Sequence, residues 1–171
     1  NIRNLRERIG DLSSQEDIFK GTLLENISLG REDVSLQMVL HACNQTGLMD
    51  FIQQQPGGIN AELLPGGKNT PGSIVTKLMV TRAIVGKHHM LALEKPLGNL
   101  TLIDRIRIAS LLTDKNAEWT LVCATEDPVL AAMCDRIIVL KEGSIVFDGS
   151  YTDLQKTEHC DHIFKYKLKN N

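Results

Sequence analysis

The sequence has few aromatic residues and no excess of positive charge. Phe, Trp and Tyr make up 4% of the 171 residues, and 19 Lys and Arg stand against 21 Asp and Glu, a formal net charge of -2. Proteins that hold nucleic acid without regard to base sequence usually carry a basic excess and aromatic side chains on which bases stack. The composition therefore argues against a nucleic-acid-binding protein.

Long hydrophobic runs are also absent. The longest apolar stretches, such as Leu121–Ala124 and Ile137–Leu140, have the length of a strand, whereas a transmembrane helix needs about 20 apolar residues. The chain opens without an initiating Met and without the apolar core of a signal peptide. We therefore expect a soluble chain, and Asn1 is either a native start or a cut point inside a longer protein.

Cysteine and histidine form no pattern typical of a metal site. The segment His159-Cys-Asp-His162 can place two imidazoles on one helical face, but a structural zinc needs four ligands and no second cluster follows. We therefore predict no metal site and a solvated terminal helix. No cysteine pair has CxxC spacing, and we expect four reduced thiols of a cytosolic protein, at least three of them packed: Cys43, Cys123, Cys134 and Cys160.

Helical patterns alternate with short apolar strands along the chain. Strong boundary signals include Gly47 as a helix stop and Asp127-Pro128 as a helix start. The order predicts an α/β fold class with a largely parallel sheet and a C-terminal hairpin. We predict strands at 8–13, 90–93 and 120–124 (the last two buried), helices at about 35–47, 73–84 and 103–112, a hairpin over 136–147, and a last helix from Thr152.

Six short stretches form a more specific pattern. They are 5–10 (LRERIG), 19–30 (FKGTLLENISLG), 47–52 (GLMDFI), 80–84 (VTRAI), 134–146 (CDRIIVLKEGSIV) and 149–154 (GSYTDL). In order and spacing they resemble the C-terminal two thirds of the nucleotide-binding domain of ABC transporters, specifically of the exporter type.

The resemblance implies a P-loop NTPase-like ABC ATPase core with a helical subdomain. The whole chain, 1–171, would be one partial domain, with the helical subdomain and signature region over about 30–85 and the C-terminal part of the core over 86–171. The implied partners are a transmembrane domain, in the same or a separate chain, and a second nucleotide-binding domain, at the cytoplasmic face of a membrane. The family's phosphate-loop strand is central in its sheet, so we expect exposed strand edges here, with an altered sheet order, dimerisation through the edges or marginal stability.

The family's phosphate loop, GxxxxGK[ST], does not occur in the chain. Its backbone N–H groups cradle phosphates and its Lys reaches them. Gly67-Lys68 and Gly86-Lys87 lack both the first Gly and the Ser or Thr of that motif. We therefore expect ATP and magnesium only in a full-length protein with the loop upstream, and no cofactor for this chain alone.

The family's catalytic positions are altered. The metal-contacting Gln falls at Ser14, with Gln15 one step away, and the switch His is replaced by Thr125. The strand that should end in Asp and Glu ends in Glu94 and Lys95. A Lys with a pKa near 10.4 is protonated at neutral pH and cannot act as a base. Lys95 is either a phosphate contact or half of a charged pair at a strand end, and no intact catalytic set is expected.

The signature motif LSGGQ corresponds to Thr70–Ile74. Pro71 replaces the Ser, Gly72 is kept, Ser73 offers a hydroxyl, and Ile74 replaces the Gln. Helix-start N–H groups near Ser73 leave some affinity for anions. We therefore keep 71–73 as a degenerate nucleotide-binding segment, together with Ser14, Gln15 and Glu94.

Three hypotheses about function remain open. In the first, the chain is an interaction protein: part of a degenerate ABC nucleotide-binding domain with an inactive ATPase site and a structural or regulatory role in transport. In the second, the full-length protein is a slow ATPase that uses water positioned by Glu94 or Gln15, since loss of a general base typically costs about 10² to 10⁴ in rate. In the third, it is an unrelated α/β binding module, without a separate helical lobe between Gly30 and Ile84.

Overall fold

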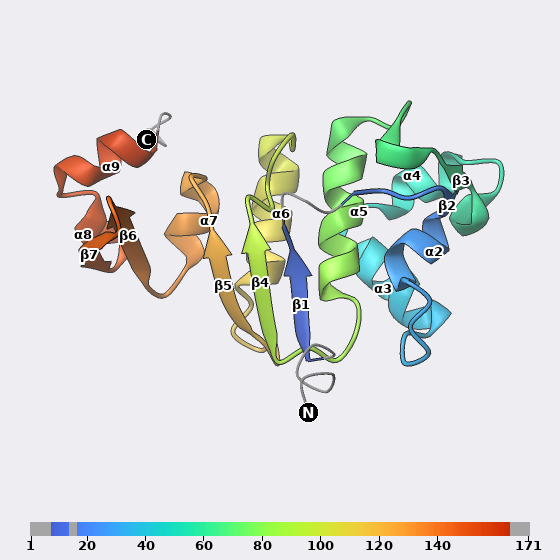
Figure 1. Ribbon diagram of the computed structural model, residues 1–171, viewed down its shortest axis with the longest axis horizontal. Coiled ribbons are helices and arrows are strands. Elements are labelled where there is room, and N and C mark those ends of the chain that lie inside the picture. The colour runs from blue at the N-terminus through green and yellow to red at the C-terminus, as the bar shows by residue number, and fades with distance from the viewer. Residues whose placement is uncertain (1–7, 14–16, 165–171) are drawn as a thin grey trace. The chain divides into compact units, whose positions relative to one another are not determined.

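The computed structural model describes residues 8–13 and 17–164. The chain divides after Ala124 into two compact units, 1–124 and 125–171, and each is described by itself (Figure 1). The first unit contains β1 (Ile9–Leu12), β2 (Gly21–Thr22), α2 (Leu23–Ser28), α3 (Leu36–Thr46), α4 (Met49–Gln54), β3 (Glu62–Leu63), α5 (Gly72–Ile84), β4 (Met90–Glu94), α6 (Leu102–Leu112) and β5 (Thr120–Ala124), with 3₁₀ turns at Gly58–Asn60 and Pro65–Gly67. The second contains α7 (Pro128–Met133), β6 (Ile137–Lys141), β7 (Ser144–Gly149), α8 (Tyr151–Leu154) and α9 (Glu158–Ile163).

Three parallel strands in the order β1-β4-β5 form the larger sheet of the first unit, and β2 and β3 pair antiparallel in a second, two-stranded sheet. This confirms the predicted α/β class with a parallel sheet, and β6 and β7 form the predicted antiparallel hairpin. One face of the sheet is buried at Leu91 and Leu93 of β4. On the opposite face, Val122 of β5 is 53% exposed. The prediction that 120–124 is buried was therefore wrong, because β5 is the last strand of this sheet and its Val122 face is open.

Helix boundaries follow the capping residues that the sequence indicated. The Ser35 hydroxyl accepts the N–H of Met38 at the start of α3, and Gly47, with φ 72°, ends it in the left-handed conformation. The Asp127 side chain accepts the N–H of Val129 at the start of α7, ahead of Pro128. These three predicted boundaries are confirmed.

A short helix, α2, was not predicted. It begins with a capping box, in which the Thr22 hydroxyl accepts the N–H of Glu25 and the Glu25 carboxylate accepts the N–H of Thr22. The box satisfies two backbone donors that the first turn would otherwise leave without acceptors. Leu23 and Ile27 on this helix are fully buried and fix it in the core.

The second unit has a small core of its own beneath the β6–β7 hairpin. Ala131, Leu154, Cys160 and Phe164 are buried there, and the Tyr151 and Phe164 rings lie 5.7 Å apart. The predicted last helix is two short helices, α8 and α9, and the first is capped by the Ser150 hydroxyl rather than starting at Thr152.

The cysteines are all free thiols, two of them buried (Cys43 and Cys160) and two half-buried (Cys123 and Cys134). Within 8–13 and 17–164, no group of three or more His, Cys, Asp and Glu side chains is placed to hold a metal ion. Over the same residues no helix is long and apolar enough to cross a bilayer.

Candidate functional site

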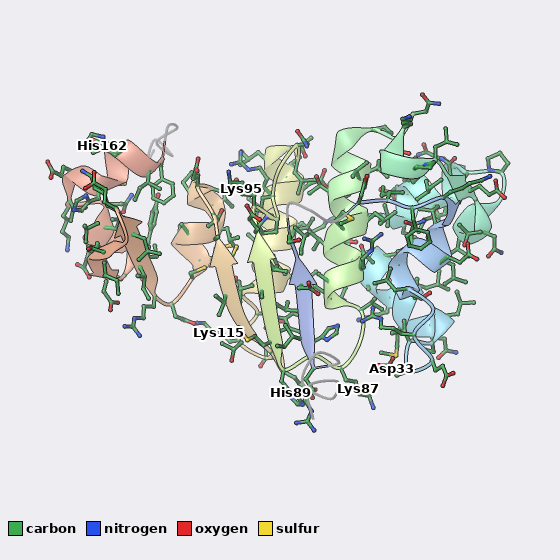
Figure 2. The ribbon with its side chains drawn as sticks, in the orientation of Figure 1. Asp33, Lys87, His89, Lys95, Lys115 and His162 are labelled. Carbon is green, nitrogen blue, oxygen red and sulfur yellow. The ribbon has the colours of Figure 1, made fainter. Side chains whose placement is uncertain are left out.

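The carboxyl end of β4 carries the two residues that replace the expected acidic pair. Glu94 closes the strand opposite Ala124 of β5, and the Lys95 N–H donates to the Ala124 carbonyl at 2.9 Å. Lys95 has φ 48°, in the left-handed region that a non-glycine residue seldom occupies. Figure 2 shows Lys95 at this end of the sheet and Lys87 at the other, so the Gly86-Lys87 pair lies away from the carboxyl edge. Ligands of α/β sheets bind at the carboxyl edge.

A tight turn follows Lys95. The Gly98 N–H donates to the Lys95 carbonyl at 3.3 Å, and Leu97 inside the turn is only 4% exposed. Asn99, with φ 59°, also lies in the left-handed region. The backbone beyond Glu94 is thus held by a buried side chain and by hydrogen bonds at both ends of the turn.

The first turn of α5 presents Gly72 and Ser73. Pro71 precedes them as the N-cap residue, and no side chain caps this end of the helix. The Pro71 carbonyl accepts the N–H groups of Ile74 at 2.9 Å and Val75 at 3.1 Å. The earlier N–H groups, at Gly72 and Ser73, have no acceptor inside the helix, as at every helix start.

The structure brings these two segments together. The Thr76 hydroxyl of α5 donates to the Gly98 carbonyl at 2.7 Å. A Cβ built on Gly72 would lie 3.5 Å from the Cβ of Asn99, in ordinary van der Waals contact. The start of α5 and the carboxyl ends of β1, β4 and β5 lie at one end of the first unit (Figure 1). The predicted 71–73 segment and the predicted Glu94–Lys95 pair are therefore neighbours through the turn 95–98.

The other predicted positions are Ser14, Gln15 and Thr125. Ser14 and Gln15 fall outside the described residues. Thr125 belongs to the second unit, where its hydroxyl accepts the Asp127 N–H at 3.0 Å. That bond makes Thr125 part of the turn that leads into α7.

A polar contact that sequence reasoning missed braces α5 from the side. Lys77 and Asp104 form an ion pair of 2.8 Å between α5 and α6, with side chains 11% and 16% exposed. Burial alone would raise the pKa of Asp104, but hydrogen bonds from Lys77 and Thr101 and the charges of Lys77 and Arg107 outweigh it, so this pKa lies below its ordinary value. Local sequence patterns could not reveal the pair, because its partners are 27 residues apart on separate helices.

A second missed cluster ties α5 to the segment that follows Gln15. Arg82 is 7% exposed and Asn26 is fully buried. The Asn26 amide accepts the Phe19 N–H at 3.1 Å and donates to the Phe19 carbonyl at 3.0 Å, and Arg82 donates to the Asp17 carbonyl at 3.2 Å. The backbone from Asp17 to Phe19 is thus fixed to both α2 and α5.

Known proteins resemble this chain in both sequence and fold. No family model matches the sequence. A lactococcin-G-processing and transport ATP-binding protein of Lactococcus lactis is 28% identical over 156 residues, 90% of this chain and 22% of that protein. A pediocin PA-1 transport/processing ATP-binding protein of Pediococcus acidilactici is 29% identical over 151 residues, 88% of this chain and 21% of that protein. A probable ABC transporter ATP-binding/permease protein of Haemophilus influenzae is 26% identical over 143 residues, 84% and 26% of the two chains.

The fold agrees with these sequence matches. A bacterial Atm1-family ABC exporter, solved with ATP bound, superposes with a TM-score of 0.85 at 23% identity, over 94% of this chain and 29% of that one. The sequence matches, together with this fold, count against an unrelated α/β module. The chain spans about a fifth to a quarter of the length of the three curated relatives above. The comparisons thus confirm that the chain resembles the ATP-binding part of ABC exporters.

Proposed function

We propose that this chain serves as the C-terminal portion of the nucleotide-binding domain of an ABC-type exporter, in which its own ATPase site is inactive. Its role is structural or regulatory within ATP-dependent transport across a membrane. The observation that carries the proposal is that a lysine, Lys95, follows β4 at its carboxyl end, where the resemblance implies a catalytic carboxylate.

The chemistry of Lys95 is unsuited to that of a general base. Its backbone is held by the bond to Ala124 and by the turn that ends at Gly98. A lysine ammonium group has no lone pair to accept a proton from water. Its charge also opposes a magnesium ion beside Glu94, because both are cations. The neighbouring Glu94 keeps a carboxylate that suits a metal-bound water.

The start of α5 supports a weakened contact to phosphate in the site of a paired domain. Gly72 leaves the backbone accessible, and the N–H groups of the first turn favour an anion. Pro71 removes one backbone donor and the hydroxyl that the family has at that position. We propose that Ser73 supplies the remaining hydroxyl of this segment.

The exposed face of β5 supports the proposal that further strands and helices of a complete domain pack against this chain. Parallel sheets normally have both faces covered, yet Val122 is 53% exposed on one face. A phosphate-loop strand placed beyond β5, with its helix over that face, would cover it. ATP and magnesium then belong to the complete domain, whose partners are a transmembrane domain and a second nucleotide-binding domain at the membrane.

A slow ATPase is the second candidate, and Glu94 is the observation that favours it. Glu94 is the last residue of β4 and pairs with Ala124 of β5, and in this second candidate its carboxylate orients water without Lys95. The site would then lack only its general base, and its turnover would be about 10² to 10⁴ lower than that of a site that has the base.

Substitutions at 94 and 95 in the full-length protein separate the two candidates. We expect no turnover of Mg-ATP in the wild type or in Lys95→Gln, which removes the charge alone. We expect measurable turnover in Lys95→Glu, which restores a carboxylate. The slow ATPase would be established by a different result: the wild type turns over Mg-ATP, Glu94→Gln abolishes this turnover, and Lys95→Gln leaves it unchanged.

A further inference from the structure

Three hydrogen bonds in series connect the end of β5 to Thr76, in the second turn of α5. The Lys95 N–H donates to the Ala124 carbonyl at 2.9 Å, and the Gly98 N–H donates to the Lys95 carbonyl at 3.3 Å. The Thr76 hydroxyl then donates to the Gly98 carbonyl at 2.7 Å. Lys95 and Gly98 each use both their N–H and their C=O groups, so the series runs through the turn without a break.

The turn 95–98 is held rigidly, so we expect its residues to move together. Leu97 is anchored in the core at 4% exposure. Lys95 and Asn99 on either side hold left-handed conformations, which persist in non-glycine residues only where the surrounding structure imposes them. Hydrogen bonds in a chain also polarise and strengthen one another. A shift of the backbone at Lys95 therefore displaces the Gly98 carbonyl.

Thr76 is the side chain that passes such a displacement to α5. Thr76 lies about one helical turn beyond Gly72 and Ser73 in α5. Gly72 itself is close to the Asn99 side chain. A hydroxyl is required for this bond, since Val has nearly the same shape and no donor. Ser keeps the donor and loses only the methyl group.

We infer that Thr76 is a positioning residue that couples the start of α5 to the Glu94–Lys95 end of the sheet. Displacement of either segment repositions the other through the turn 95–98. The coupling is a property of the fold, and only its use in nucleotide binding rests on the proposed function.

A mutant cycle read by amide NMR tests the coupling without nucleotide. Lys95→Gln should shift the Ser73 amide resonance in the wild-type background. The shift should fall to less than about half in Thr76→Val and return in Thr76→Ser, because coupled residues fail additivity and independent ones do not. An equal shift in all three backgrounds would overturn the inference.

A matched control guards against general loosening of the fold. The Thr113 hydroxyl donates to the Ala109 carbonyl at 2.8 Å in the same unit, and it lies outside the series. Thr113→Val removes a comparable bond and should leave the Lys95→Gln shift at Ser73 unchanged. If Thr113→Val abolishes that shift as Thr76→Val does, then loss of stability explains both and the inference is wrong.

Repeating the measurement with Mg-ATP on the complete, paired nucleotide-binding domain separates this inference from the proposed function. Absence of any shift at Gly72 and Ser73 in the wild type would count against nucleotide binding at α5, and the ligand-free cycle would still decide the coupling. If Mg-ATP shifts the Gly72 and Ser73 amide resonances, we expect the Lys95 amide resonance to shift as well in the wild type and in Thr76→Ser. If the Lys95 amide shifts by the same amount in Thr76→Val, the coupling is wrong, and the proposed function still stands.

Discussion

Arg82 donates from Nε to the main-chain carbonyl of Asn26 at 2.7 Å and from Nη2 to its Oδ1 at 3.2 Å, and both residues are buried. The pair joins the end of α5 to α2 and, through the Asp17 carbonyl, to the segment after β1. A buried guanidinium is stable only where acceptors surround it. The acceptors here are mostly backbone oxygens, so the contact depends on the fold of three separate segments.

Removing the guanidinium should therefore destabilise the first unit. Arg82→Met keeps most of the side-chain stem but removes the donor to the two oxygens of the buried Asn26, and we expect a loss of about 1–3 kcal/mol in the free energy of unfolding. Urea denaturation measures it. The exposed Lys68→Met is the matched control, expected within about 0.5 kcal/mol of the wild type. Equal stability of the two variants would contradict this role for Arg82.

Gly10 of β1 should tolerate no side chain. A Cβ at this position would lie well inside contact distance of the Ala83 carbonyl of α5 and 2.7 Å from a Leu91 methyl group. Because the carbonyl belongs to a helix packed on the sheet, we expect Gly10→Ala to cost about 1–3 kcal/mol. A Cβ at Gly98 meets only an ordinary contact of 3.7 Å, so Gly98→Ala should change the melting temperature far less. Comparable melting temperatures would refute the close approach of α5 to β1.

The Lys77–Asp104 ion pair should make the free energy of unfolding fall at acidic pH. The pKa of Asp104 is lowered in the folded chain, so the folded state binds fewer protons there than the unfolded state. Its contribution is complete above the unfolded pKa of about 3.9 and disappears as the pH falls through the folded value. We expect Asp104→Asn to cost about 1.5–3 kcal/mol at pH 7 and much less near pH 2.

Urea denaturation across this pH range measures the difference, with the exposed Asp33→Asn as the control. A constant difference between the wild type and Asp104→Asn at every pH would show that the carboxylate charge makes no contribution.

Thiol reactivity should distinguish Cys43 from Cys134. Cys43 is fully buried, and burial raises the pKa of its thiol to about 12. Because the thiolate is the reactive form, native Cys43 should resist iodoacetamide at pH 8. The half-buried Cys134 should be alkylated first, and urea should remove the difference. Mass spectrometry of the modified peptides measures both, and equal native rates would contradict the core placement of α3.

Local signals in the sequence predicted much of the fold. Ser35, Gly47 and Asp127 mark helix ends through backbone hydrogen bonds and left-handed geometry that are encoded within a few residues. The exposure of Val122 could not be predicted in this way, since an apolar strand looks the same whether it is central or last in its sheet. The Thr76–Gly98 contact was also missed, because it joins residues that only the packing of α5 against the β1–β4 sheet brings together.

The candidate site was predicted through resemblance more than through pattern. Glu94, Lys95 and the 71–73 segment were named separately, and the structure adds that the turn 95–98 makes them neighbours. Ser73 and Lys95 carry no local signal for a shared site, since 21 residues and a whole helix separate them.

The most direct test of the inactive site is ATP binding and single-turnover phosphate release in the full-length protein. We expect saturable binding of Mg-ATP, with no phosphate released from the site that contains Lys95. A competent partner domain, if present, is first silenced by its own catalytic substitution. Stoichiometric phosphate release from the Lys95 site would contradict the account, because it would show that this cation does not prevent hydrolysis.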